Sequence, residues 1–113
     1  MSGDYEALDE ARNSYLKATR SLPEMAAKYA EAEAEYQRAK AVRVMEMRAD
    51  GAPATLIQLM VKGDKAVNRK LFERDSAKSL YEATNKAIDT YKLDARLLES
   101  RIQRDWNSQG GIL

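Results

Sequence analysis

A heptad pattern in the first third of the chain restricts the fold more than any other feature. Two columns of residues recur every seven positions over five heptads, and all ten positions are apolar or aromatic. The columns are Leu8, Tyr15, Leu22, Tyr29 and Tyr36, and Ala11, Ala18, Met25, Ala32 and Ala39. This stripe is typical of a long helix packed along another helix, and its alanine column favours close approach. Beyond it we expect a drift to Val42, Met45 and Ala49.

A second stripe of the same kind covers residues 77 to 102. Its members follow alternating steps of four and three: Ala77, Tyr81, Thr84, Ile88, Tyr91, Ala95, Leu98 and Ile102. Leu80, Ala87 and Leu97 widen this stripe beyond what one partner helix needs. We therefore expect these three residues, with Trp106, to form an interface with a partner or with a second copy of the chain.

Glycine and proline, which interrupt helices, are scarce. Residues 5–50 and 64–107 contain one such residue, Pro23. The segment Ser21-Leu22-Pro23-Glu24 has the pattern of a helix start, yet the heptads pass through it in phase. A break and a kink in one continuous helix both remain open. Because two helices make a thin core, either residues 5–20 fold back as a third helix or two chains pair into a bundle.

The stretch GAPATLIQLMVKGD, residues 51 to 64, separates the two stripes. We expect a turn at residues 50–53, a short helix opened by Pro53 or Thr55 and closed by Gly63, and an Asp64 cap on the next helix. A strand would have nothing to pair with. The helix should place Leu56, Ile57 and Met60, with Leu59, against the ends of the long helices as a structural cap, and the alternative is a binding site.

These features predict an all-α fold. The chain should form a long antiparallel helical hairpin with a short connecting helix, paired into a dimeric helical bundle. Residues 1–113 should make a single domain in which residues 1–4 and 108–113 fray.

Charge is distributed unevenly, although the net charge is only +1. Residues 1–37 carry four basic and eight acidic residues, whereas residues 38–74 carry nine basic and four acidic ones. In a hairpin the basic part gathers at the connecting end. The candidate nucleic-acid contacts there are Arg43, Arg48, Lys65, Arg69, Lys70 and Arg74. A protein partner, self-assembly and a simply solvated surface are the alternatives.

The residues expected of an enzyme or a metal site are missing from this sequence. It contains no histidine and no cysteine, so the commonest general base and the commonest metal ligands are lacking. It also lacks a glycine-rich phosphate loop. We therefore predict no catalytic residue, metal, cofactor or small-molecule substrate. The first residues lack a signal-peptide pattern and no apolar run is long enough to span a bilayer, so we expect a cytoplasmic protein.

Three segments carry a resemblance: "YAEAEAEYQRAKAVRVMEMR", "GAPATLIQLMVKGD" and "AKSLYEATNKAIDTYKLDARLLESRIQRDW". Over residues 25 to 106 the chain resembles small helical proteins encoded by phages and prophages, most of which have no assigned function. The resemblance implies an accessory role in phage DNA metabolism or in countering host defence, and it implies no site residues. We expect a non-enzymatic adaptor that binds a protein, with nucleic-acid binding and structural self-assembly as alternatives.

Overall fold

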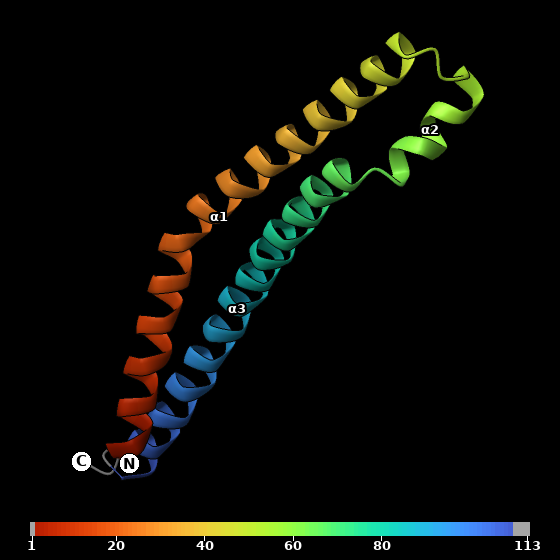
Figure 1. The fold of residues 1–113 in the computed structure, drawn as a ribbon. Coiled ribbons are helices and arrows are strands. Elements are labelled where there is room, and N and C mark those ends of the chain that lie inside the picture. The colour runs from red at the N-terminus through yellow and green to blue at the C-terminus, as the bar shows by residue number, and fades with distance from the viewer. Residues whose placement is uncertain (1, 110–113) are drawn as a thin grey trace. The chain divides into compact units, whose positions relative to one another are not determined.

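The structure of the protein, a computed structural model, describes residues 2–109. It contains three α-helices, α1 (Ser2–Ala49), α2 (Ala54–Lys62) and α3 (Lys65–Gln109), and no strand in the described part of the chain (Figure 1). α1 and α3 pack against each other as an antiparallel hairpin that α2 connects. The predicted all-α hairpin with a short connecting helix is therefore confirmed. Residues 2–4 and 108–109 are helical, while residues 1 and 110–113 lie outside the described range.

Contacts divide the three helices into two compact units. The terminal unit consists of α1 up to Pro23 and of α3 from Glu82 onward, and the connector unit is Glu24–Tyr81. Helix α1 continues through Pro23, so the alternatives of a break and of a third helix over residues 5–20 are wrong. The hydroxyl of Ser21 donates to the Ala18 carbonyl at 2.9 Å, within the helix, instead of capping a new one.

Both predicted stripes face the partner helix. All ten heptad positions of α1 are buried or half-buried, with Leu8 and Ala11 the most enclosed. The opposite positions, such as Glu10 and Lys17, are exposed. The eight positions of the α3 stripe are half-buried. In the connector unit the rings of Tyr29 and Tyr81 lie 6.1 Å apart between centroids, so aromatic side chains from both helices meet in the stripe.

The predicted drift of the α1 stripe to Val42, Met45 and Ala49 is wrong, because all three are exposed. The stripe instead passes through half-buried Arg43 and reaches buried Met47. Arg43 lies one heptad after Tyr36 and therefore holds the position that the pattern assigns to the stripe. A search for apolar residues alone passes over Arg43, and its ion-pair partner on the neighbouring segment, Asp64, is twenty-one residues away.

The turn after α1 is a Schellman motif, as the sequence Asp50-Gly51-Ala52-Pro53 suggests. Gly51 has a φ of +83°, its N–H donates to Arg48 at 3.0 Å, and the N–H of Ala52 donates to Met47 at 2.9 Å. Together these bonds satisfy carbonyls of the last helical turn. Ala52 also packs against the buried cluster that includes Met47. Pro53 then stands at the N-cap of α2, and Gly63 ends that helix as predicted.

Helix α2 turns a different side to the core than we expected. Ile57 and Val61 are 3% and 2% exposed, and they form a small core with Met47 and Val67. The burial of Ile57 agrees with the prediction, whereas Val61 is not among the predicted inner residues. Leu56, Leu59 and Met60, which the sequence assigned to the structural cap, are exposed instead. Their placement as core residues is therefore wrong.

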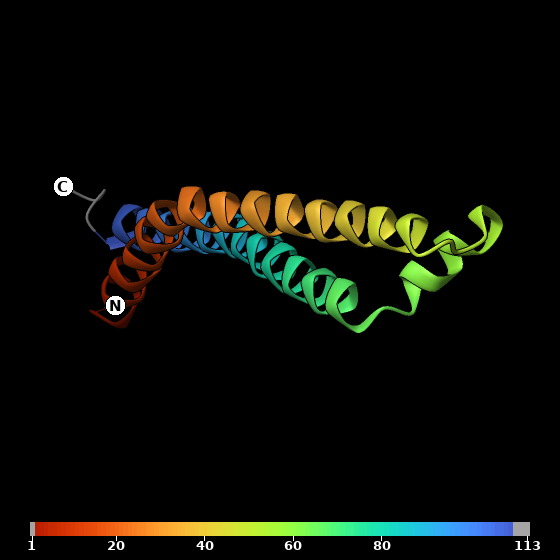
Figure 2. The same ribbon diagram turned by 45° about the horizontal axis from the view of Figure 1, so that its top comes forward.

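Asp64 caps α3 as predicted. Its Oδ2 accepts from the backbone N–H of Val67 at 3.0 Å, and its carbonyl accepts from the N–H of Asn68 at 2.9 Å. The side chain of Asn68 donates back to the carbonyl of Lys62 at 2.9 Å, at the end of α2. These bonds connect α2 to α3 through the short turn that Figure 2 shows beside α2.

Candidate functional site

The candidate site is the outer face of α2, defined here as Leu56, Leu59 and Met60. These side chains are 47%, 69% and 44% exposed. Since each helical residue advances about 100°, positions i, i+3 and i+4 share one face, and the buried pair Ile57 and Val61 lies on another. α2 is thus apolar around most of its circumference, a composition typical of a helix covered on more than one side. In the connector unit only one of these sides is covered.

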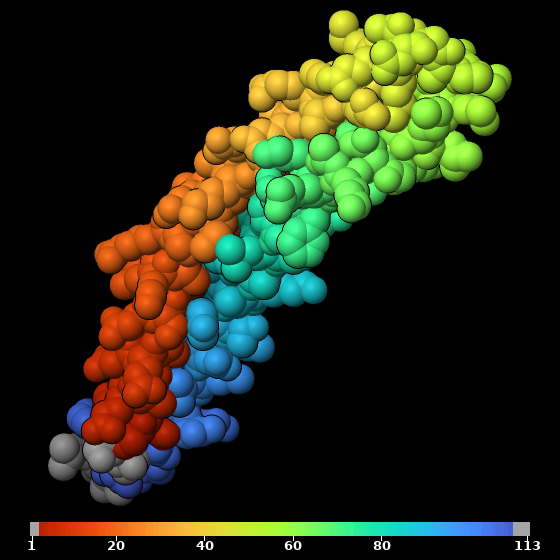
Figure 3. Space-filling view, in the orientation of Figure 1, coloured from red at the N-terminus to blue at the C-terminus, as the bar shows by residue number. Residues whose placement is uncertain are grey.

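The space-filling view shows how this segment contributes to the surface. In Figure 3 the light-green atoms of α2 and the yellow atoms of the last turns of α1 lie together on the surface of the connector unit. Val42 and Met45, near the end of α1, are also exposed. The connector unit therefore has several large apolar side chains on its surface that are not part of its small core.

Cations accompany the apolar residues at this end of the unit. These four are exposed: Arg48 lies at the end of α1, Lys62 at the end of α2, and Lys65 and Arg69 in the first two turns of α3. Within residues 2–109 none of them has an acidic side chain within 4.0 Å. Their charge is therefore available to a ligand.

The other three predicted nucleic-acid contacts are engaged in the hairpin. Arg43 donates from Nε to Asp64 at 2.9 Å. Lys70 reaches Glu35 on α1 at 3.2 Å, and Arg74 reaches Glu33 at 2.7 Å. The guanidinium of Arg74 also lies over the ring of Tyr36, 5.1 Å from its centroid. These three cations hold α3 to α1. Of the six predicted contacts, the remaining three are Arg48, Lys65 and Arg69, which have no acidic partner among the described residues.

These contacts shift the pKa values of the groups concerned. Hydrogen bonds from Gln37 and then Arg74 lower the pKa of Glu33. Hydrogen bonds to carboxylates raise the pKa of Lys70, through Glu35 first and Glu73 second. Each shift favours the charged form, because hydrogen bonds to that form stabilise it, and an oppositely charged partner adds to the effect. The cross-links between α1 and α3 are therefore ionic at neutral pH.

The predicted interface residues are divided between the two units. Leu80 belongs to the connector unit, whereas Ala87, Leu97 and Trp106 belong to the terminal unit. Leu80, Leu97 and Trp106 are exposed and Ala87 is half-buried. Their role as an interface stays a prediction.

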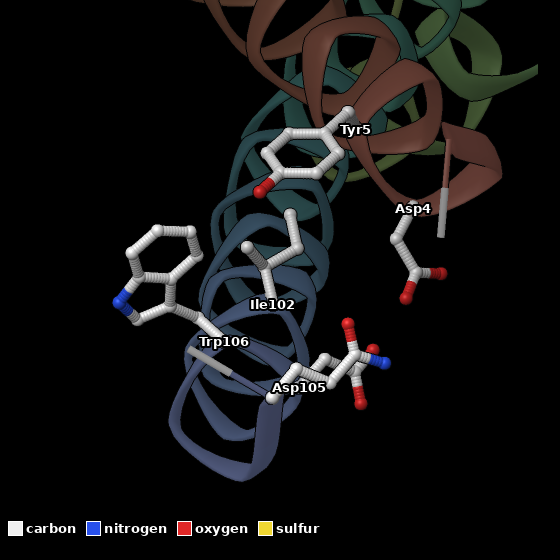
Figure 4. Close-up of a pocket in the computed structure, with 6 residues that line it drawn as sticks. Asp4, Tyr5, Ile102, Asp105 and Trp106 are labelled. Atoms are coloured by element: carbon white, nitrogen blue, oxygen red, sulfur yellow. The ribbon is translucent and has the colours of Figure 1, made fainter. Parts of the chain in front are cut away.

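Trp106 lines a small hollow in the terminal unit (Figure 4). The close-up shows the Tyr5 ring above Ile102, with Trp106 to one side and the Asp4 carboxylate on the other. Asp4 is already bonded to Arg101 at 3.3 Å. The hollow has a volume of about 30 Å³, room for one water molecule and not for an organic ligand.

Neither a metal cluster nor a membrane-spanning helix is present over the described range. No three histidine, cysteine, aspartate or glutamate side chains among residues 2–109 converge as metal ligands. In that same range no helix combines the length and the apolar character needed to cross a bilayer.

From the sequence, a binding site on this helix was the alternative to a structural cap, and the residues that face outward were assigned to the cap. The one available signal was that apolar side chains occupy both the Ile57 side and the Leu59 side of a nine-residue helix. Compared with protein-family models, with curated proteins and with solved structures, the chain matches none.

Proposed function

We propose that this protein acts by binding another protein, and that the outer face of α2 is its main contact surface. The observation that carries the proposal is the exposure of Leu56, Leu59 and Met60 on a helix whose other side is already packed. Buried apolar surface stabilises an association by about 25 cal/mol per Å², so a partner that covers this face gains affinity from all three side chains.

The thin core supports the same proposal. Among residues 2–109 only six apolar residues are buried, and four of them belong to the cluster around α2. In the same described range, twelve large apolar residues are exposed. Clustered exposed apolar residues commonly mark interaction sites in small proteins. A dimeric bundle would cover part of this surface, and the predicted homodimer is included in the proposal.

The resemblance to phage-encoded helical proteins suggests the kind of partner. We propose a phage or host factor that acts on nucleic acid or in defence, which would place the protein in the host cytoplasm. Catalysis and a cofactor have no part in this proposal.

The test uses a photo-crosslinking amino acid in place of Leu59, and in a second variant in place of Leu16, an exposed leucine of the terminal unit. We expect a crosslinked protein from the Leu59 position that is absent from the Leu16 position. Leu59→Ser with Met60→Ser should abolish the complex while leaving the circular dichroism melt nearly unchanged. If both positions crosslink the same proteins equally, the outer face of α2 is not the contact surface.

A second candidate function is binding of single-stranded nucleic acid through the start of α3. Lys65, Arg69 and Phe72 are spaced at i, i+4 and i+7, which puts them on one helical face, and all three are exposed. Unpaired cations bind phosphates, and an exposed ring can stack on a base. This arrangement is the observation that favours the candidate.

Fluorescence anisotropy with a labelled single strand tests this second function. At about 50 mM salt we expect binding that weakens steeply by about 200 mM, since phosphate contacts release counterions. Lys65→Glu with Arg69→Glu should abolish it, whereas the control Lys17→Glu should not. Binding that does not weaken as the salt concentration rises, or that persists in the Lys65→Glu, Arg69→Glu double variant, would contradict the phosphate contacts.

A further inference from the structure

The terminal unit contains an open groove between the first turns of α1 and the last turns of α3. It encloses a hollow of about 410 Å³. Its apolar lining comes from both helices: Ala7, Ala11, Tyr91, Leu97 and Leu98. The α1 side of this lining is alanine, which leaves room for side chains from outside. Leu97 is exposed, so the groove offers an apolar surface to a ligand.

The rim of the groove is acidic. Glu10 and Asp94 line it, both are exposed, and neither has a basic side chain within 4.0 Å among residues 2–109. Arg101 also lines the groove, but its guanidinium is paired with Asp4 at 3.3 Å. The uncompensated charge of the rim is therefore negative.

The outer face of α2 has complementary properties. It presents a ridge of three large apolar side chains, and Lys62 at the end of α2 is a cation without an acidic partner in the described chain. At 1.5 Å per residue, the ridge from residue 56 to residue 60 is about 6 Å long, and the groove from residue 7 to residue 14 is about 10 Å long. A ridge of one helix fits a groove of this kind when their chemistry agrees.

We propose that the outer face of α2 of one copy docks into this groove of a second copy. The inference rests on the proposed function, since it uses the same surface of α2 and names its partner. The apolar ridge covers the alanine and leucine lining, and the cation Lys62 faces the carboxylates Glu10 and Asp94.

Charge complementarity singles out a second copy as the occupant. The terminal unit has nine acidic and eight basic residues, and the connector unit has nine acidic and eleven basic ones. One chain thus carries both an apolar surface beside the unpaired cation Lys62 and an apolar groove with the unpaired carboxylates Glu10 and Asp94. Because the two surfaces differ, the contact is heterologous, and each copy can bind one neighbour through α2 and another through its groove.

Complementation between two disabled variants tests this inference. Leu59→Asp disables the ridge, and Asp94→Lys with Leu97→Lys disables the groove; all of these residues are exposed, so the fold should tolerate the changes. Leu16→Asp is the matched control, because it places the same charge on an exposed leucine of the terminal unit that does not line the groove. Circular dichroism melts establish that each variant folds.

Sedimentation velocity is then measured over on the order of 10 to 500 µM, the range in which a small interface associates. The wild type and Leu16→Asp should grow beyond two chains as concentration rises. Each disabled variant alone should associate at least roughly tenfold more weakly. An equimolar mixture of the two should form a two-chain species and stop there, since it retains one intact ridge and one intact groove.

Two results would overturn the inference. One is a wild type that stays monomeric throughout, and the other is a mixture that associates no better than its separate components. Both leave the proposed function standing, because that function is contradicted by a different result, equal crosslinking of the same proteins from the Leu59 and Leu16 positions. If the wild type associates but the mixture of the two disabled variants does not, the contact is a symmetric dimer in place of the ridge-and-groove contact.

Discussion

Arg43 and Asp64 join the end of α1 to the start of α3 through a single carboxylate. Arg43 donates from Nε to Oδ1 at 2.9 Å, while Oδ2 of the same group accepts from the N–H of Val67 at 3.0 Å. The capping bond and then the guanidinium lower the pKa of Asp64. One residue thus begins a helix and fixes it to its neighbour.

The lowered pKa of Asp64 predicts acid sensitivity. Because the pKa is lower in the folded state, this group stabilises the fold above its unfolded pKa, and the contribution is lost as pH falls through the folded pKa. Asp64→Asn keeps an oxygen for the cap but does not titrate. We expect the urea midpoint of the wild type to exceed that of Asp64→Asn at pH 7, and the gap to close in acid. Parallel midpoints at all pH values would contradict the role of the charge.

Ile57 and Leu59 should respond differently to the same change. Ile57→Ala removes buried methyl groups from the α2 core and should destabilise the protein by about 2 to 5 kcal/mol. Leu59→Ala removes an exposed side chain and should change stability by less than about 0.5 kcal/mol. Urea denaturation followed by circular dichroism measures both. Equal losses would show that the outer face of α2 is buried in solution.

Gly51 and Gly63 form a second matched pair. Gly51 has a φ of +83°, where a side chain is strained, so Gly51→Ala should cost about 1 to 2 kcal/mol even though nothing lies within 4 Å of the new methyl. Gly63 has an ordinary φ of −93°, and its new methyl would lie 3.7 Å from the Met60 carbonyl. Gly63→Ala should therefore be neutral or stabilise by about 0.4 to 1 kcal/mol. Thermal melts should show a clear loss for Gly51→Ala and none for Gly63→Ala.

A charged side chain at a stripe position should strongly lower the stability of the hairpin. Tyr29→Asp places a carboxylate where the Tyr29 ring meets Tyr81, and it should destabilise the hairpin by roughly 3 kcal/mol or more. Ala30→Asp puts the same charge on the exposed side of the same helix turn. This control should melt close to the wild type. If the two variants melt together, Tyr29 does not face α3.

The long helices were predictable because their pattern repeats. An apolar residue every three or four positions over many turns fixes which side of α1 faces α3, and the Leu8 and Ile88 stripes needed no tertiary information. The end of α1 and the start of α3 were predictable from local chemistry too, since the turn at Gly51 and the cap at Asp64 act through bonds to residues within five positions.

Arg43 and the outer face of α2 show what the sequence leaves open. The stripe position of Arg43 depends on Asp64, twenty-one residues away, and no local pattern shows that the two meet. Helix α2 has only nine residues and is apolar on two sides. Periodicity therefore does not decide which side faces the core, because either side is compatible with a helix. The sequence by itself determined the helical class, the α1 stripe as far as Ala39, the α3 stripe and the helix ends at Gly51, Gly63 and Asp64, whereas the continuity of α1 through Pro23 stayed open. Only the tertiary structure decided that Ile57 and Val61 pack inward and that Leu59 faces out, because that choice depends on where the ends of α1 and α3 meet.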